Sequence, residues 1–210
     1  MDKKLLLLDL DGVIVDTRAN MMQAWSDVCK QFNIAVEFER YFENIGRPFS
    51  DIMSTLGLAE LAEQIAKVFN SSSSDHMHLV AVYPGMQETL KKLVDRNVKL
   101  GIVTSKDTER TKKVIHRLAV DFVTVQTPNG KLRGKPAPDH LLAAISTANH
   151  DPAECCYIGD MAVDSEAANR AGICYGHASW GYGDLPEGVD LVLDNCSDLL
   201  SLVSPQRQSH

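Results

Sequence analysis

The sequence has no long hydrophobic run, no cysteine pair at metal-binding spacing and no excess of positive charge. Its apolar stretches are too short to cross a bilayer, which predicts no membrane association. The opening run after Met1-Asp2-Lys3-Lys4 is interrupted by Asp9, and it is therefore too short for the core of a secretory signal peptide. We expect a protein of the cytoplasm.

Charge and cysteine content further limit the kinds of protein that this chain can be. The net charge of -7 and the pI of about 5.4 argue against general affinity for nucleic acid or anionic membranes, although a small anion could bind locally. The five cysteines are scattered and odd in number, which favours reduced thiols. With 210 residues, 44% of them hydrophobic, the chain can form one domain, or one domain with a small insert.

The most informative stretch lies near the N-terminus, where Leu5-Leu6-Leu7-Leu8 leads into Asp9-Leu10-Asp11-Gly12. Such an apolar run, ended by a turn signal, predicts a strand buried on both faces, as in parallel sheets. The two-residue period of a strand places Asp9 and Asp11 on one face. Two carboxylates so placed need a cation, a shared proton or open water. An exposed Asp-x-Asp-Gly turn is the alternative.

Two patterns divide the rest of the chain. Between residues 17 and 81 the apolar spacing predicts only helices, at 17–32, 37–44, 48–56 and 58–69, with the serine-rich segment 70–75 as a loop or hinge. After residue 82, helices alternate with strands expected at 98–104, 122–125, 155–159, 173–176 and 190–193. This alternation predicts βαβ units and a mostly parallel α/β sheet. The last helix is expected at 197–203, followed by a polar, frayed tail at 204–210.

Polar residues follow several of the predicted strands, and parallel strands would bring them to one edge. They are Asp9 with Asp11, Thr104 with Ser105, Lys135 in Gly134-Lys135-Pro136, and Asp160 with Asp164. Each has an ordinary explanation by itself, such as a solvated lysine or a helix N-cap. Together and in this order they are specific.

These stretches resemble the haloacid dehalogenase-like superfamily, in the branch of phosphoglycolate phosphatases and β-phosphoglucomutases. The matching segments are Asp9 to Thr17, Ile102 to Ser105, Gly134 to Pro138 and Ile158 to Asp164; Pro84-Gly85 and Trp180 to Gly183 are also similar. The resemblance implies a Rossmann-like core, residues 1–16 and 82–210, with a helical cap at 17–81.

The resemblance also implies site roles. Asp9 would attack phosphorus and form an aspartyl-phosphate, and Asp11 would be the general acid and base. Mg²⁺ would be held by Asp9, the Asp11 carbonyl and Asp160, with Asp164 binding it directly or through water. The phosphoryl oxygens would contact Lys135, Thr104 and N–H groups near Gly12; Ser105, where many relatives have asparagine, has a less defined role.

Three further features separate the possible functions. Asp11 favours phosphoryl transfer, because dehalogenases of the superfamily lack this second aspartate. The mutases resemble Asp-Thr-Ala-x-x-His after the nucleophile, whereas Asp16 to Met21 contains no histidine, which favours a phosphatase acting on a small phosphorylated metabolite. Arg47, in a loop similar to the specificity loop of the family, could bind a substrate carboxylate or be a solvated arginine. A phosphomutase and a non-catalytic phosphate-binding protein remain alternatives, as do a monomer and a homodimer.

Overall fold

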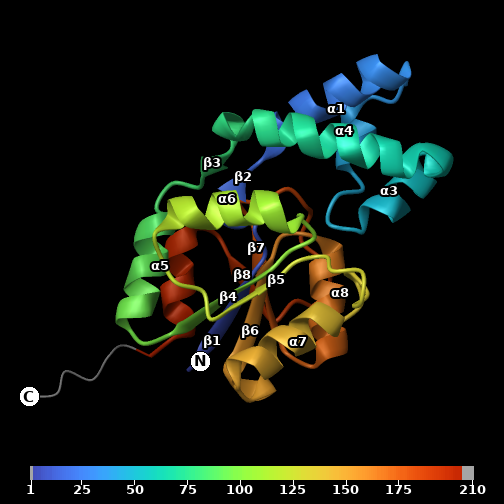
Figure 1. Cartoon of the computed structure of the whole chain (residues 1–210). Coiled ribbons are helices and arrows are strands. Elements are labelled where there is room, and N and C mark those ends of the chain that lie inside the picture. The colour runs from blue at the N-terminus through green and yellow to red at the C-terminus, as the bar shows by residue number, and fades with distance from the viewer. Residues whose placement is uncertain (1, 205–210) are drawn as a thin grey trace, which may run out of the picture. The chain divides into compact units, whose positions relative to one another are not determined.

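The computed structural model describes residues 2–204 of the chain (Figure 1). The chain divides into two compact units. One contains Met1–Val15 and Val82–His210, and the other contains Asp16–Ala81. We call the first the core unit and the second the helical unit.

A six-stranded parallel sheet forms the centre of the core unit, in the order β5-β4-β1-β6-β7-β8. The strands are β1 (Leu5–Leu8), β4 (Lys99–Val103), β5 (Thr124–Gln126), β6 (Cys155–Gly159), β7 (Cys174–Ala178) and β8 (Leu191–Leu193). All four leucines of β1 are fully buried, because this strand has neighbours on both sides and side chains packed over both faces. The predicted α/β fold with a parallel sheet is confirmed.

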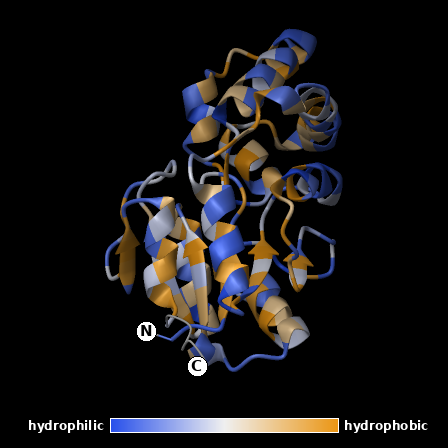
Figure 2. Ribbon diagram, turned by 90° about the vertical axis from the view of Figure 1, so that its left-hand side faces the viewer, coloured by the Kyte–Doolittle hydropathy of each residue, from blue (hydrophilic) through white to orange (hydrophobic). Residues whose placement is uncertain are grey.

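Helices cover the sheet. They are α5 (Met86–Asp95), α6 (Thr108–Leu118), α7 (Asp139–Ala148), α8 (Ala162–Ala171), and the 3-10 helices η3 (Pro152–Glu154) and η4 (Cys196–Leu202). Leu5, Leu7 and Tyr157 belong to a buried cluster that includes Leu141 of α7 and Ala167 of α8. Figure 2 shows apolar residues concentrated along the strands of the sheet. This packing holds the carboxyl ends of β1, β4 and β6 at one edge of the sheet.

The helical unit contains α1 (Arg18–Phe32), α2 (Phe38–Phe42), α3 (Phe49–Thr55), η1 (Ala59–Leu61), α4 (Ala62–Asp75) and η2 (Met77–Leu79). Helix α1 packs along α4, and Trp25 stacks on Tyr41 with ring centroids 4.5 Å apart. The short strands β2 (Val15–Asp16) and β3 (Ala81–Val82) form a separate two-stranded sheet where the chain passes between the units.

The serine-rich segment 70–75, predicted as a loop or hinge, is helical, because α4 continues to Asp75. The hydroxyl of Ser72 donates to Asp27 Oδ2 at 2.6 Å, and that of Ser73 donates to Asn20 Oδ1 at 2.5 Å. These bonds to α1 satisfy side chains that would otherwise compete for the helix backbone. Tertiary contacts therefore override the low helix propensity of the serines.

Smaller differences concern the type or the bounds of single elements. The segment predicted as a last helix is a 3-10 helix, and the strand expected at 122–125 begins at Thr124. The polar tail expected at 204–210 lies outside the described residues, apart from Ser204. Within residues 2–204, no helix combines the length and the apolar character that crossing a bilayer requires.

Candidate active site

Lys135 and two carboxylates form the centre of the site at the carboxyl edge of the sheet. Asp9 follows β1 directly, Asp164 lies in the first turn of α8, and Lys135 comes from the loop after β5. Lys135 Nζ donates to Asp9 Oδ2 at 2.8 Å and to Asp164 Oδ1 at 2.6 Å. All three residues are buried. The structure thus brings together three predicted residues that are far apart in sequence.

Asp160, the third buried carboxylate, completes an acidic cluster with Asp9 and Asp164, in which one ligand atom of each lies within 4.8 Å of the others. Asp160 Oδ2 accepts a hydrogen bond from the N–H of Tyr182 at 2.8 Å. Its Oδ1 is buried and has no hydrogen-bond partner among residues 2–204. A buried carboxylate oxygen left in this way is well suited to a metal ion.

The charges of the cluster do not balance. Three carboxylates surround the single ammonium of Lys135, so the fully ionised group carries two negative charges in excess. Burial raises the pKa of Asp9 to about 6, with Asp164 acting in the same direction and Lys135 opposing it. Burial, together with Asp164 and Asp9, also raises the pKa of Asp160. A divalent cation would neutralise the excess, and oxygen ligands of this kind suit Mg²⁺.

Asp164 supports the neighbouring backbone. Its Oδ2 accepts from the N–H groups of Asp160 and Met161 at 3.2 and 3.0 Å. Its Oδ1 accepts from Lys135 and from the hydroxyl of Tyr157. Each oxygen of Asp164 therefore already accepts two hydrogen bonds, so the geometry favours a positioning role over direct metal binding.

Two glycines make room for Asp160. A Cβ at Gly12 would collide with the Asp160 carboxylate, and one at Gly181 would collide with the Cβ of Asp160. Gly12 also has a φ of 85°, in the left-handed region that favours glycine. Its N–H donates to the carbonyl of Val15 at 2.9 Å. The structure therefore supports one role for Gly12, which is to let the backbone approach the side chain of Asp160 closely. Binding of phosphate by the Gly12 N–H stays a prediction.

Asp11 forms a second ion pair at this edge. Both of its carboxylate oxygens lie 3.0 Å from Nζ of Lys106, whose side chain is only 3% exposed. Asp11 itself is partly accessible, with 18% of its side chain exposed. An accessible carboxyl group held beside Asp9 could exchange protons with a bound molecule. Lys106 was not predicted as a site residue.

Thr104 and Ser105 lie where β4 ends, as predicted. Thr104 is buried, and its Oγ1 accepts from the N–H of Lys106 at 3.2 Å. A hydroxyl that accepts this bond still carries a proton for donation. Ser105 is half-buried. Arg47, in contrast, belongs to the helical unit, where it is exposed just before α3; its predicted role in binding stays a prediction.

Tyr157 is a second residue that sequence reasoning missed. Its hydroxyl accepts from Lys135 Nζ at 3.1 Å and lies 3.1 Å from both the carbonyl of Val103 and Asp164 Oδ1. Burial, with Asp164 and Asp9, raises the pKa of Tyr157, so the phenol stays protonated. The alternation of β6 could have indicated Tyr157, because the third residue of a five-residue strand points to one face together with the first and last.

Residues 6–177 match the family model described as haloacid dehalogenase-like hydrolase. The chain belongs to this family. The haloacid dehalogenase-like fold includes both the parallel sheet and the helical region after β1. The site is accordingly that of a phosphatase-type hydrolase, with an acidic cluster typical of a Mg²⁺ site.

Individual relatives cover nearly the whole chain. A β-phosphoglucomutase of Bacillus subtilis is 29% identical over 93% of this chain and 91% of its own length. A phosphoglycolate phosphatase of Aquifex aeolicus is 26% identical over 95% and 96% of the two chains. A pyrophosphatase PpaX of Oceanobacillus iheyensis is 22% identical over 97% and 98%. These names differ in substrate, so they support phosphoryl chemistry without selecting one compound.

Solved structures agree on the fold. A hydrolase from Pseudomonas syringae superimposes with a TM-score of 0.84 at 26% identity, covering 95% of this chain and 96% of its own. A haloacid dehalogenase-like family hydrolase from Streptococcus pneumoniae has a TM-score of 0.84 at 19% identity, covering 95% and 97%.

Proposed function

We propose that this hydrolase is a Mg²⁺-dependent phosphatase that cleaves a small phosphomonoester, such as phosphoglycolate or a sugar phosphate, through phosphorylated Asp9. The observation that carries the proposal is the buried cluster of three carboxylates, two of which pair with the ammonium of Lys135. A cation bound to this cluster would neutralise its excess negative charge. A phosphate ester is itself an anion, so its charge must also be neutralised before a carboxylate can attack it.

Asp9 is the nucleophile in this proposal. Lys135 fixes its Oδ2, and the N–H of Leu10 donates to its Oδ1 at 2.7 Å. These bonds orient the carboxylate, and attack on phosphorus forms the aspartyl-phosphate while the alcohol leaves. Mg²⁺ would be held by Asp9, the Asp11 carbonyl and Asp160, with Asp164 in support. It would neutralise charge on the phosphoryl oxygens. Lys135 and the Thr104 hydroxyl would bind those oxygens as charge moves onto them.

Asp11 handles the protons. It would protonate the leaving alcohol and then remove a proton from the water that hydrolyses the aspartyl-phosphate, a contribution of about 10²–10⁴-fold in such enzymes. Its ion pair with Lys106 holds the carboxylate in one orientation. In this proposal the buried Asp9 attacks phosphorus, and the more accessible Asp11 exchanges the protons.

A β-phosphoglucomutase-like activity is the second candidate, because a relative with that name is 29% identical. The absence of histidine between Asp16 and Met21 favours hydrolysis. Supplying a hexose 1-phosphate with a sugar bisphosphate activator distinguishes the two, since a mutase yields the isomer and a phosphatase yields inorganic phosphate.

The test of the proposal is phosphate release from a panel of small phosphomonoesters, with Mg²⁺ and after treatment with EDTA. We expect release from at least one compound with Mg²⁺ and loss of that release after EDTA. Release that persists without metal contradicts the proposed cation site. No turnover across a broad panel supports the remaining alternative, a phosphate-binding protein without catalysis.

A further inference from the structure

Cys156 and Cys174 lie side by side on neighbouring strands. They are directly paired in the register of β6 and β7, so their side chains leave the same face of the sheet. Their sulfur atoms are 3.2 Å apart, and the S–H of Cys156 donates to the sulfur of Cys174. Both residues are thiols in the structure.

The backbone at this pair already has the spacing that a disulfide needs. Neighbouring strands are about 4.7–4.9 Å apart, and the Cα atoms of a disulfide are typically about 4.4–6.8 Å apart. Closing the bond would bring the sulfur atoms from 3.2 Å to about 2.05 Å. Side-chain rotation can supply this movement while the two strands keep their register.

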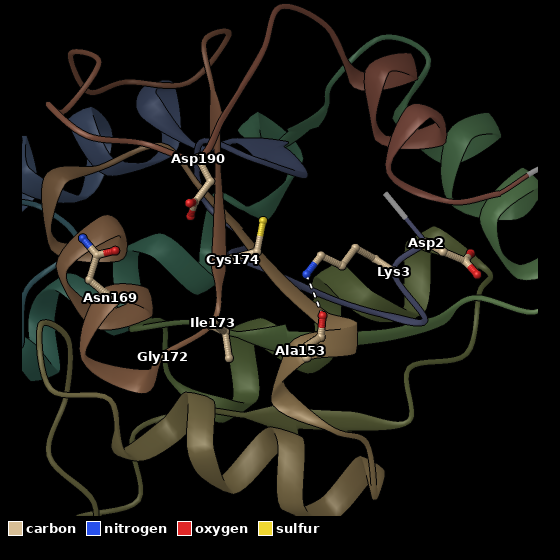
Figure 3. Close-up of a pocket in the computed structure, with 8 residues that line it drawn as sticks. All are labelled: Asp2, Lys3, Ala153, Asn169, Gly172, Ile173, Cys174 and Asp190. Atoms are coloured by element: carbon tan, nitrogen blue, oxygen red, sulfur yellow. Dashed lines mark hydrogen bonds between the residues drawn. The ribbon is translucent and has the colours of Figure 1, made fainter.

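Cys174 lines a pocket of about 580 Å³ (Figure 3). The pocket lies at the amino ends of the strands, the edge of the sheet opposite to Asp9. Lys3, Asn169 and Asp190 also line it, and Lys3 Nζ donates to the carbonyl of Ala153 at 2.8 Å. Cys174 is half-buried and lines the pocket, whereas Cys156 is buried and does not line it. A molecule entering the pocket would therefore meet Cys174 first.

The surroundings make the two thiols unequal. The hydrogen bond from Cys156 lowers the pKa of Cys174, and the ammonium of Lys3 acts in the same direction, against burial and the carboxylate of Asp190. The same hydrogen bond, with burial, raises the pKa of Cys156. Cys174 is thus the better nucleophile, and Cys156 is placed to act as the resolving thiol, which attacks the oxidised Cys174.

We propose that Cys174 and Cys156 form an oxidation site that reacts with hydroperoxides and closes to an intramolecular disulfide. The Cys174 thiolate attacks the terminal oxygen of the peroxide, the O–O bond breaks, and the sulfur becomes a sulfenic acid as hydroxide leaves from hydrogen peroxide or an alkoxide leaves from an organic hydroperoxide. The sulfur of Cys156 then attacks that of Cys174, the S–S bond forms, and the hydroxyl group departs as water with the proton of Cys156. The two sulfurs lose two electrons in total, and the peroxide gains them.

The test treats the full, folded chain with hydrogen peroxide, alkylates the remaining thiols and maps the peptides by mass spectrometry. We expect a linked pair of peptides containing Cys156 and Cys174, lighter by two hydrogen atoms than the reduced pair and recovered as two thiols after dithiothreitol. If both cysteines are instead alkylated after peroxide treatment, or each is oxidised without being linked to the other, the proposal is wrong.

Cys155 provides a matched control, because it adjoins Cys156 but belongs to the buried cluster of Leu5, Leu7 and Tyr157. Its S–H donates to the carbonyl of Asp151 at 3.2 Å, and burial raises its pKa to about 11. Cys155→Ser should keep the linkage. Cys156→Ser should stop at a sulfenic acid on Cys174 that dimedone traps. Loss of the linkage in folded Cys155→Ser contradicts the assigned pair, and so does the absence of a dimedone adduct in folded Cys156→Ser. If a variant fails to fold, the wild-type peptide map alone tests the proposal.

Discussion

Lys135 Nζ lies 2.8 Å from Asp9 Oδ2, although 126 positions separate the two residues. Both side chains are almost completely buried, at 3% and 6% exposure. Burial lowers the pKa of Lys135, but the carboxylates of Asp164 and Asp9 more than offset this and raise it overall, so the ammonium stays charged. The proposed nucleophile and the proposed phosphate-binding cation thus hold each other in position.

Replacing Lys106 tests whether it positions Asp11. Lys106→Met should lower kcat by about 10–10²-fold with little change in KM, because Asp11 loses the ion pair that orients it. Lys106→Arg should recover most of the rate, since arginine can pair with the same carboxylate. Lys112→Met is the control, because Lys112 is exposed and pairs with Glu109. An unchanged kcat in Lys106→Met would show that the ion pair is not needed for turnover.

Tyr157→Phe should destabilise the fold by about 1–3 kcal/mol, because the buried partners of the hydroxyl each lose a hydrogen-bond contact. Those partners are Lys135, Asp164 and the carbonyl of Val103. Urea unfolding measures the change. Tyr175→Phe is the matched control, since Tyr175 is paired with Tyr157 in the sheet and the contacts of its hydroxyl are long, at 3.4 and 3.5 Å. Equal losses in both variants would contradict the role assigned to the Tyr157 hydroxyl.

The metal-free chain should become less stable as the pH rises from about 4 to about 6 through this site. The pKa of Asp9 is raised from 3.8 to about 6, so over that interval the folded state holds a proton that the unfolded state has lost. Asp160, whose pKa is also raised, contributes in the same direction. Melting temperatures are measured in EDTA across this interval for wild type and for Asp160→Asn. The difference between the two proteins isolates the contribution of Asp160 to the pH dependence of stability.

Asp160→Asn should melt higher than wild type at neutral pH without metal, because it removes one of three buried negative charges. Mg²⁺ should raise the melting temperature of wild type and have little effect on the variant. A variant that melts lower than wild type without metal, or that Mg²⁺ stabilises as strongly, would contradict the charge argument.

Arg47→Ala should raise KM for phosphoesters that carry a carboxylate by about 10–10²-fold, the value of a charge-assisted hydrogen bond. KM for an aryl phosphate whose aryl group is uncharged should change little, since this compound offers no second anion. Arg40→Ala, which removes another exposed arginine of the helical unit, is the control. Equal changes on both substrates would remove Arg47 from substrate recognition.

The sequence predicted the sheet edge well, because consecutive parallel strands bring their carboxyl ends together whatever lies between them. This geometry explains why Asp9, Lys135 and Asp160 could be grouped from their positions along the chain. Lys106 could not be, because a lysine in a loop is ordinarily solvated and its burial against Asp11 depends on tertiary packing. The prediction of a loop at the serine run of α4 was wrong for a similar reason. The hydrogen-bond partners of these serines, Asn20 and Asp27, lie about fifty residues earlier in the chain.

Turnover by Asp9→Asn tests the central claim most directly. The amide cannot act as the nucleophile, so phosphate release with Mg²⁺ should fall by at least about 10³-fold. Circular dichroism should show the fold retained, and Asp121→Asn, at an exposed aspartate, should keep wild-type activity. Phosphate release by folded Asp9→Asn at a rate near that of wild type would contradict the assignment of Asp9 as the nucleophile.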